Sequence, residues 1–128
     1  MSYKYIFDTF AWVELFDGTE KGKKVLLLLE EDVVATSVIV LAELSDKCRR
    51  ENWNIEPFLQ YIRAKAMILP LSQEIAIKSG FYKTELRKIC RNISLPDAIH
   101  YTTARENNAI LVTGDSDFKD VKNNVLFL

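Results

Sequence analysis

The chain has 128 residues, enough for one domain with a single core but too few for two. Apolar residues make up 48% and charged residues 27%, a balance that excludes a disordered or membrane-embedded class. The net charge of −1 excludes a protein that binds nucleic acid by bulk positive charge alone. We find no apolar run of membrane-spanning length and no secretory signal pattern, and therefore expect a cytoplasmic protein with no membrane partner.

Strand-like and helix-like segments alternate along the chain, with no linker or repeat between them. Short apolar runs predict strands at residues 4–7, 32–36, 67–71, 109–113 and 124–128. Helical periodicity and capping residues predict helices at 9–16, 20–31, 37–51, 55–65, 72–91 and from 94 to about 107. This alternation predicts an α/β fold in which helices cover both faces of a parallel sheet, built as a single domain over residues 1–128.

Aspartates stand at three places where a strand ends or a helix begins, and each place has two interpretations. Asp8 follows the first predicted strand, which suits either a ligand site at the sheet edge or the N-cap of the next helix. Asp97 completes a Ser94-x-x-Asp capping pattern. Asp115 and Asp117, in TGDSDF, follow the fourth strand and suit turn or cap positions. When each aspartate is considered alone, a capping role is enough to explain it.

Glu43 is harder to explain in that way, because nearly all its neighbours in the first two turns of its helix are apolar. A carboxylate buried there would be paired, protonated or bound to a metal. The alternative is an exposed ion pair with Lys47, four residues further along the helix.

Together these acids predict one metal site, because carboxylates gathered at such positions repel one another unless cations or shared protons offset their charge. Oxygen ligands suit Mg²⁺ or Mn²⁺, whereas zinc prefers the His and Cys side chains of which this chain has few. The single histidine, His100, lies one turn after Asp97. A role as general base or metal ligand is conceivable, but its apolar neighbours favour packing.

Four short motifs carry a resemblance to a known family. They are FDT at residues 7–9, VLAEL at 40–44, LPDAIH at 95–100 and LVTGDSDF at 111–118. In order and spacing they resemble the PIN domain, and the whole chain resembles the toxin nucleases of VapBC-type toxin–antitoxin pairs.

The resemblance implies a three-layer α/β/α fold with a central parallel sheet. It implies that Mg²⁺ or Mn²⁺ is held by a catalytic and metal-binding quartet, with one auxiliary acid and two supporting hydroxyls. These residues are Asp8, Glu43, Asp97 and Asp115, then Asp117, then Thr9 and Thr113. Phe10 departs from the pattern, since many relatives carry a small polar residue there.

The activity implied is hydrolysis of RNA phosphodiester bonds by metal-activated water, in a homodimer that a small antitoxin protein inhibits. Two other functions remain open. A phospho-accepting receiver domain also clusters acids, but it needs an adjacent acidic pair after the first strand, where Asp8 stands alone. The second is a PIN-like domain that binds RNA or protein without cleaving it. Only an activity assay distinguishes it from the enzyme.

Overall fold

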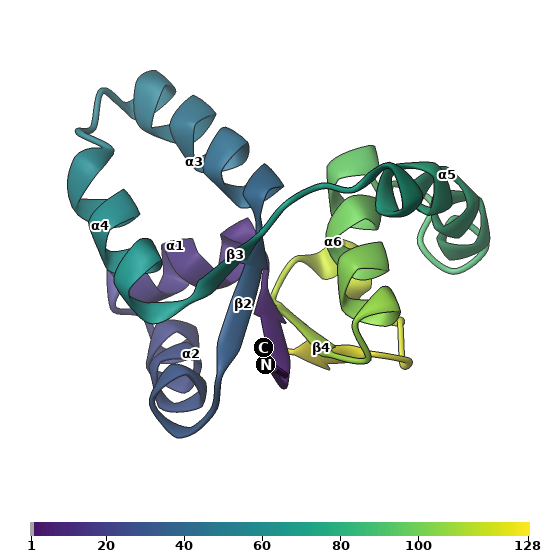
Figure 1. The fold of residues 1–128 in the computed structure, drawn as a ribbon, viewed down its shortest axis with the longest axis horizontal. Coiled ribbons are helices and arrows are strands. Elements are labelled where there is room, and N and C mark those ends of the chain that lie inside the picture. Colours follow the sequence, from purple (N-terminus) through teal and green to yellow (C-terminus); the bar gives the residue numbers. More distant parts are fainter. Residues whose placement is uncertain (1) are drawn as a thin grey trace.

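The computed structural model describes residues 2–128, which fold into a parallel sheet flanked by helices (Figure 1). The strands are β1 (Tyr5–Phe7), β2 (Val34–Ser37), β3 (Met67–Leu69), β4 (Ile110–Thr113) and β5 (Val125–Phe127). The helices are α1 (Thr9–Asp17), α2 (Glu20–Glu31), α3 (Val38–Glu51), α4 (Glu56–Lys65), α5 (Gln73–Leu86) and α6 (Leu95–Glu106). A 3₁₀ turn, η1 (Ser116–Phe118), follows β4.

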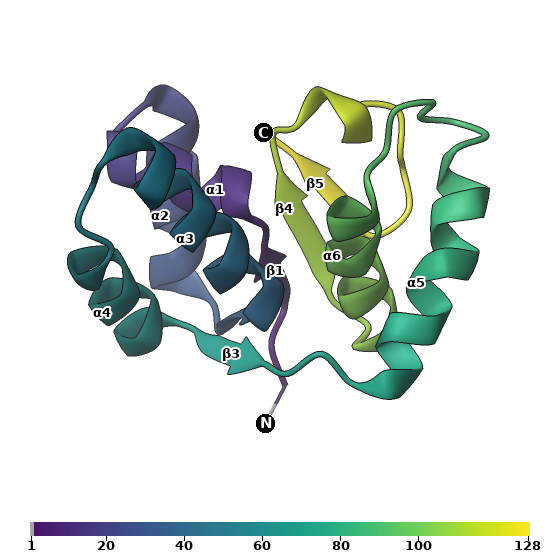
Figure 2. The same ribbon diagram turned by 90° about the horizontal axis from the view of Figure 1, so that it is seen from above.

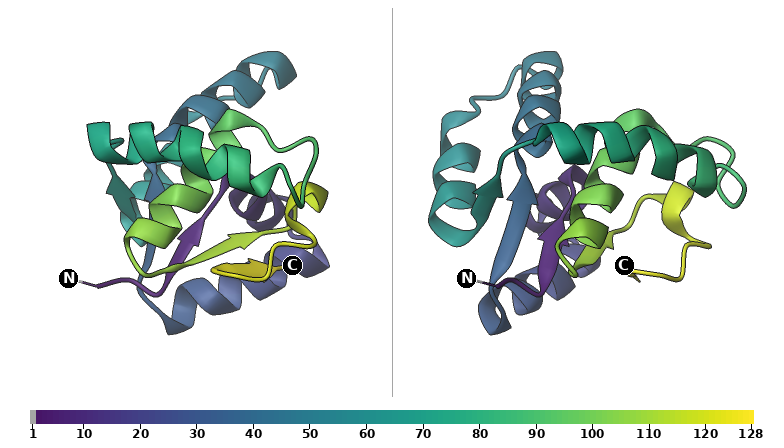
Figure 3. Two further views of the ribbon diagram at one scale, coloured as in Figure 1. Left: turned by 90° about the vertical axis from the view of Figure 1, so that its right-hand side faces the viewer. Right: turned by 45° about the vertical axis from the view of Figure 1, so that its right-hand side comes forward.

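The strand order is β3-β2-β1-β4-β5, and every neighbouring pair is parallel. β1 lies at the centre, with Tyr5 in register with Val34 of β2 and with Ile110 of β4. Helices α1 to α4 lie on one side of this sheet and α5 and α6 on the other (Figures 2 and 3). The predicted three-layer α/β/α fold with a central parallel sheet is therefore confirmed.

The alternation of side chains along β1 divides the core into two clusters. Tyr5 and Phe7 face the cluster that includes Trp12 of α1 and Leu44 of α3. Ile6 faces the opposite cluster, which α5 and α6 complete with residues such as Leu86, Tyr101 and Ala104. A strand buried on both faces must be apolar throughout, which explains the YIF run of β1.

Helix starts agree with the capping residues in the sequence. The hydroxyl oxygens of Ser37, Ser72 and Ser94 accept hydrogen bonds from backbone N–H groups in the first turns of α3, α5 and α6. None of the helices formed by residues 2–128 is both long and apolar enough to span a bilayer.

The predicted helix over residues 72–91 is too long, because α5 ends at Leu86. The N–H groups of Ile89 and Cys90 both donate to the carbonyl oxygen of Leu86, at 2.9 and 2.7 Å, and close a tight turn. The turn is needed because α6 begins at Leu95 and packs against α5, so the chain must reverse direction between them. No Gly or Pro marks this reversal in the sequence before Pro96.

A candidate metal centre of carboxylates

Two of the predicted acids leave the sheet at the same edge. Asp8 directly follows β1, and Asp115 follows β4 after one intervening glycine. Because β1 and β4 are adjacent and parallel, their carboxyl ends lie side by side. The sheet topology therefore brings together two acids that are far apart in the sequence.

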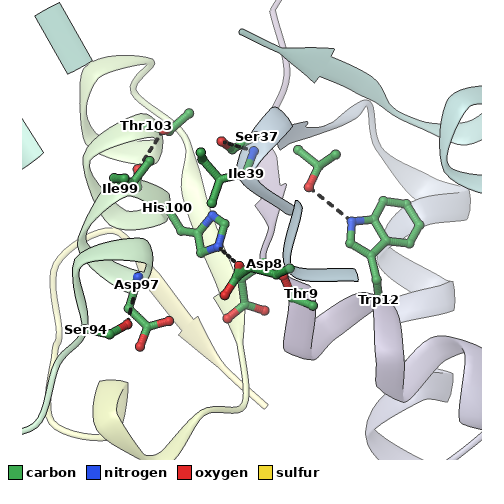
Figure 4. Close-up of polar contacts among 12 residues, drawn as sticks. Asp8, Thr9, Trp12, Ser37, Ile39, Ser94, Asp97, Ile99, His100 and Thr103 are labelled. Atoms are coloured by element: carbon green, nitrogen blue, oxygen red, sulfur yellow. Dashed lines mark hydrogen bonds and ion pairs between the residues drawn. The ribbon is translucent and has the colours of Figure 1, made fainter. Parts of the chain in front are cut away.

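The other two acids come from helices. Glu43 lies in the second turn of α3, which begins where β2 ends, and Asp97 lies in the first turn of α6. All four acids line one cavity of about 390 Å³, which we call the acidic cavity. Its lining is Asp8, Thr9, Phe10, Val13, Glu14, Glu43, Lys47, Asp97, His100 and Asp115. In Figure 4, Asp97 and His100 extend from α6, and Asp8 from the end of β1, toward a common space.

Asp8 and Asp115 both cap helical segments, as their positions in the sequence suggested, and they also belong to the acidic cluster. Oδ1 of Asp8 accepts a hydrogen bond of 2.9 Å from the Ala11 N–H and caps α1. Oδ1 of Asp115 accepts one of 2.9 Å from the Asp117 N–H and caps η1. Each cap is made through Oδ1, so neither cap uses the Oδ2 atom of its aspartate.

Burial makes the charge of Asp8 unfavourable. The side chain is 3% exposed, and its carboxyl pKa is raised to about 6, chiefly by burial and in smaller part by the charge of Asp97. The charge of His100 and hydrogen bonds from Thr113 and Ala11 oppose that rise. The pKa of Asp97 is also raised, first by burial and then by the charges of Asp115 and Glu43. A divalent cation at this place would offset both effects.

Glu43 is partly buried, but it does not pair with Lys47. Its Oε1 accepts a hydrogen bond of 2.8 Å from the Thr9 hydroxyl and lies 2.6 Å from Nε2 of His100. Burial favours the neutral acid, yet these hydrogen bonds and the charge of His100 outweigh it and lower the pKa of Glu43. Lys47 instead places its ammonium over the Trp53 ring.

His100 is buried, as its apolar neighbours suggested, but it also reaches the site. Burial lowers the pKa of its imidazole, while the hydrogen bond to Glu43 and the charges of Asp8, Glu43 and Asp97 raise it, and the net direction is upward. The sequence held one signal of this role, because His100 stands one helical turn after Asp97 and so shares its side of α6.

Asp117 lies close to two of the four predicted metal ligands, Asp97 and Asp115. Within residues 2–128, the carboxylate oxygens that come nearest to forming a cation site belong to Asp97, Asp115 and Asp117, one oxygen each within 4.8 Å of one another. Three oxygen donors with no sulfur or imidazole fit Mg²⁺ or Mn²⁺ and do not favour zinc. Thr113 supports the group, since its hydroxyl accepts from the Asp115 N–H at 3.1 Å and hydrogen-bonds Asp8.

Phe10 forms an aromatic wall of the acidic cavity. Its ring lies against Gly114, and a Cβ added to that glycine would stand 2.4 Å from Cε1 of Phe10. The absence of a side chain at Gly114 therefore leaves the space that the Phe10 ring occupies beside the acids.

Fold and site together define an α/β domain with a carboxylate centre at the carboxyl edge of its sheet. The chain belongs to the PIN-domain family, whose sequence model matches residues 5–124. This membership rules out the receiver domain. A comparison with curated proteins gives no match.

Solved structures similar to this one include chains of toxin–antitoxin complexes. A toxin–antitoxin complex from Klebsiella pneumoniae holds a chain that is 27% identical, with a TM-score of 0.73 and 96% of each chain covered. VapBC2 from Rickettsia felis, bound to a promoter DNA fragment, has 23% identity and a TM-score of 0.73, covering 97% of this chain and 96% of that one. Mycobacterium tuberculosis VapC20, a sarcin–ricin loop cleaving toxin, has 17% identity and a TM-score of 0.71, covering 91% and 93%. The expected resemblance to VapBC-type proteins is confirmed for the fold.

Proposed function

We propose that this protein is a metal-dependent endoribonuclease, the toxin of a VapBC-type pair. One observation carries the proposal: acids from four separate elements line a single cavity at the carboxyl edge of the sheet. Acids that served only as local caps or ion pairs would have no reason to meet in one place. Membership of the PIN family and the likeness to a chain of a toxin–antitoxin complex support the same function.

The proposed cation is Mg²⁺ or Mn²⁺, held by Asp97, Asp115 and Asp117 together with Asp8 and Glu43. When bound, such a cation makes water a stronger nucleophile and offsets charge on the phosphate and the leaving oxygen. Residues of the chain would position the ligands and attract the substrate. Thr113 and Ala11 hold the Asp8 carboxylate in place, and Lys47, the lysine of the cavity lining, is placed to attract an RNA phosphate.

Three further features follow from the same proposal. The partner would be an antitoxin protein, since one similar solved structure is described as a toxin–antitoxin complex. The chain would act as a homodimer, as the family resemblance implies. RNA substrate and antitoxin would meet it in the cytoplasm.

The experiment is RNA cleavage by the purified chain with Mg²⁺ or Mn²⁺, with a chelator, and with the Asp97→Asn variant. We expect cleavage that the chelator and Asp97→Asn each abolish. Asp120→Asn is the matched control, because Asp120 is exposed and outside the acidic cavity. Equal cleavage by Asp97→Asn would contradict the proposal.

A PIN-like domain that binds RNA or protein without cleaving it is the remaining alternative. It predicts that the wild-type chain retains RNA in a binding assay and leaves it intact at every metal concentration. Cleavage that depends on the metal and on Asp97 excludes it.

A further inference from the structure

We propose that His100 is a positioning residue which, with Thr9, holds one oxygen of Glu43 so that the other is presented to the metal. The inference rests on the proposed function, because it assigns Glu43 to the metal centre. It gives a role to His100, which lies in the LPDAIH motif but belongs neither to the acidic quartet nor to its supporting hydroxyls.

Both hydrogen bonds to Glu43 end on the same atom. Oε1 accepts from the Thr9 hydroxyl at 2.8 Å and contacts Nε2 of His100 at 2.6 Å. A carboxylate oxygen has two lone pairs in its plane, so these two donors fill the capacity of Oε1. Among the described residues, no protein group hydrogen-bonds Oε2, although the Glu43 side chain lines the acidic cavity. Oε2 is therefore the oxygen left for a cation.

The two donors also connect Glu43 to the segments that carry other acids. Thr9 is the residue after Asp8 and begins α1, while His100 follows Asp97 by one turn on α6. Glu43 itself belongs to α3. The paired hydrogen bonds thus link Glu43 of α3 to the start of α1, which Asp8 caps, and to α6, which carries Asp97. A flexible glutamate without them would lose that arrangement to side-chain rotation.

The other ring nitrogen of His100 argues against a purely structural role. Nδ1 is buried and has no hydrogen-bond partner in the described part of the chain, on a side chain that is 1% exposed. Leaving a buried polar atom unpaired is unfavourable to folding. A phenylalanine would fill similar space without that penalty, so the advantage of histidine here is the hydrogen bond of Nε2.

The test is Mn²⁺ binding to the full chain, measured by electron paramagnetic resonance without RNA. His100→Phe removes the donor and keeps a ring. His100→Gln places an amide N–H near the position of Nε2, whereas His100→Asn places it near Nδ1, too far back to reach Glu43. We expect His100→Phe and His100→Asn to weaken Mn²⁺ binding about tenfold or more, the usual effect of losing a group that orients a metal ligand. His100→Gln should restore the affinity to within about threefold of wild type.

Two results would overturn the inference. One is a folded His100→Phe protein that binds Mn²⁺ as tightly as wild type, and the other is a His100→Gln protein as weak as His100→Phe, which would assign the effect to ring packing. If His100→Phe does not fold, Thr9→Val and Thr9→Ser test the same hydrogen bonds from the other side. Thr9→Val must then weaken Mn²⁺ binding and Thr9→Ser must not.

This experiment separates the inference from the proposed function. A wild-type chain that binds no Mn²⁺ refutes both. A wild-type chain that binds Mn²⁺, with no loss in His100→Phe, refutes only the positioning role.

Discussion

Asp8→Asn should make the metal-free protein more stable, although it removes an acid of the proposed metal centre. The Asp8 carboxyl is fully buried beside Asp97, and its pKa of about 6 compares with 3.8 for an unperturbed aspartate. Folding therefore costs free energy whenever the side chain is charged. Asparagine removes the charge but keeps an oxygen that can cap α1, since Asn and Asp cap helices about equally well.

The magnitude follows from the difference between the two pKa values. At 1.36 kcal/mol per pKa unit, the rise from 3.8 to about 6 corresponds to about 3 kcal/mol at neutral pH. The asparagine amide also brings N–H donors into the buried site, and these need partners. We therefore expect a net gain of about 1–3 kcal/mol, or a melting temperature higher by about 4–12 °C in a domain of this size.

The gain should depend on pH in a defined direction. Because the folded pKa is raised, the native state holds the proton more tightly than the unfolded chain between pH 3.8 and about 6. The contribution of the Asp8 carboxyl to the free energy of unfolding of the wild type is fully present below pH 3.8 and is lost as pH rises through about 6. The difference between Asp8→Asn and wild type should therefore be largest above pH 6 and vanish near pH 4.

The assay is thermal melting in a chelator between pH 4 and 8, with two comparison variants. Asp8→Ala loses the helix cap as well as the charge, so it should gain less than Asp8→Asn by about 0.5–2 kcal/mol. Asp120→Asn changes an exposed acid and should stay within about 0.5 kcal/mol of wild type. If Asp8→Asn melts below wild type at pH 7.5, Asp8 is a helix cap whose charge costs nothing, and the argument from burial is wrong.

Two further predictions concern the cation and the aromatic wall. Mg²⁺ at about 100 times its dissociation constant should stabilise wild type by about 2.7 kcal/mol, and melting should show a much smaller gain for the Asp97→Asn, Asp115→Asn double variant. An equal gain in both would place Mg²⁺ elsewhere. Gly114→Ala should lower the free energy of unfolding by about 1–3 kcal/mol in denaturant titrations, because the new Cβ would meet the Phe10 ring at 2.4 Å. Adding Phe10→Ala should recover part of that loss, and no recovery would show that the ring is not the obstacle.

Much of this protein could be predicted from local sequence because the signals are local. Ser37, Ser72 and Ser94 mark helix starts by their own hydrogen bonds to the next turn. The apolar run of β1 needs only its own residues to indicate a strand buried on both faces. The aspartates were recognisable as candidates for the same reason, since each stands next to an element boundary, and Glu43 stood out because its neighbours in the helix are apolar.

Tertiary structure alone decided which groups meet. Glu43 had a partner four residues away in Lys47, yet it pairs with His100, 57 residues along the chain, because the sheet order places α3 and α6 at the same edge. The end of α5 at Leu86 was likewise not encoded by a Gly or Pro, and followed from the need to return the chain for α6. Local sequence sets capping and periodicity over a few residues, whereas the contacts between acids depend on strand pairing between segments that are distant in the sequence.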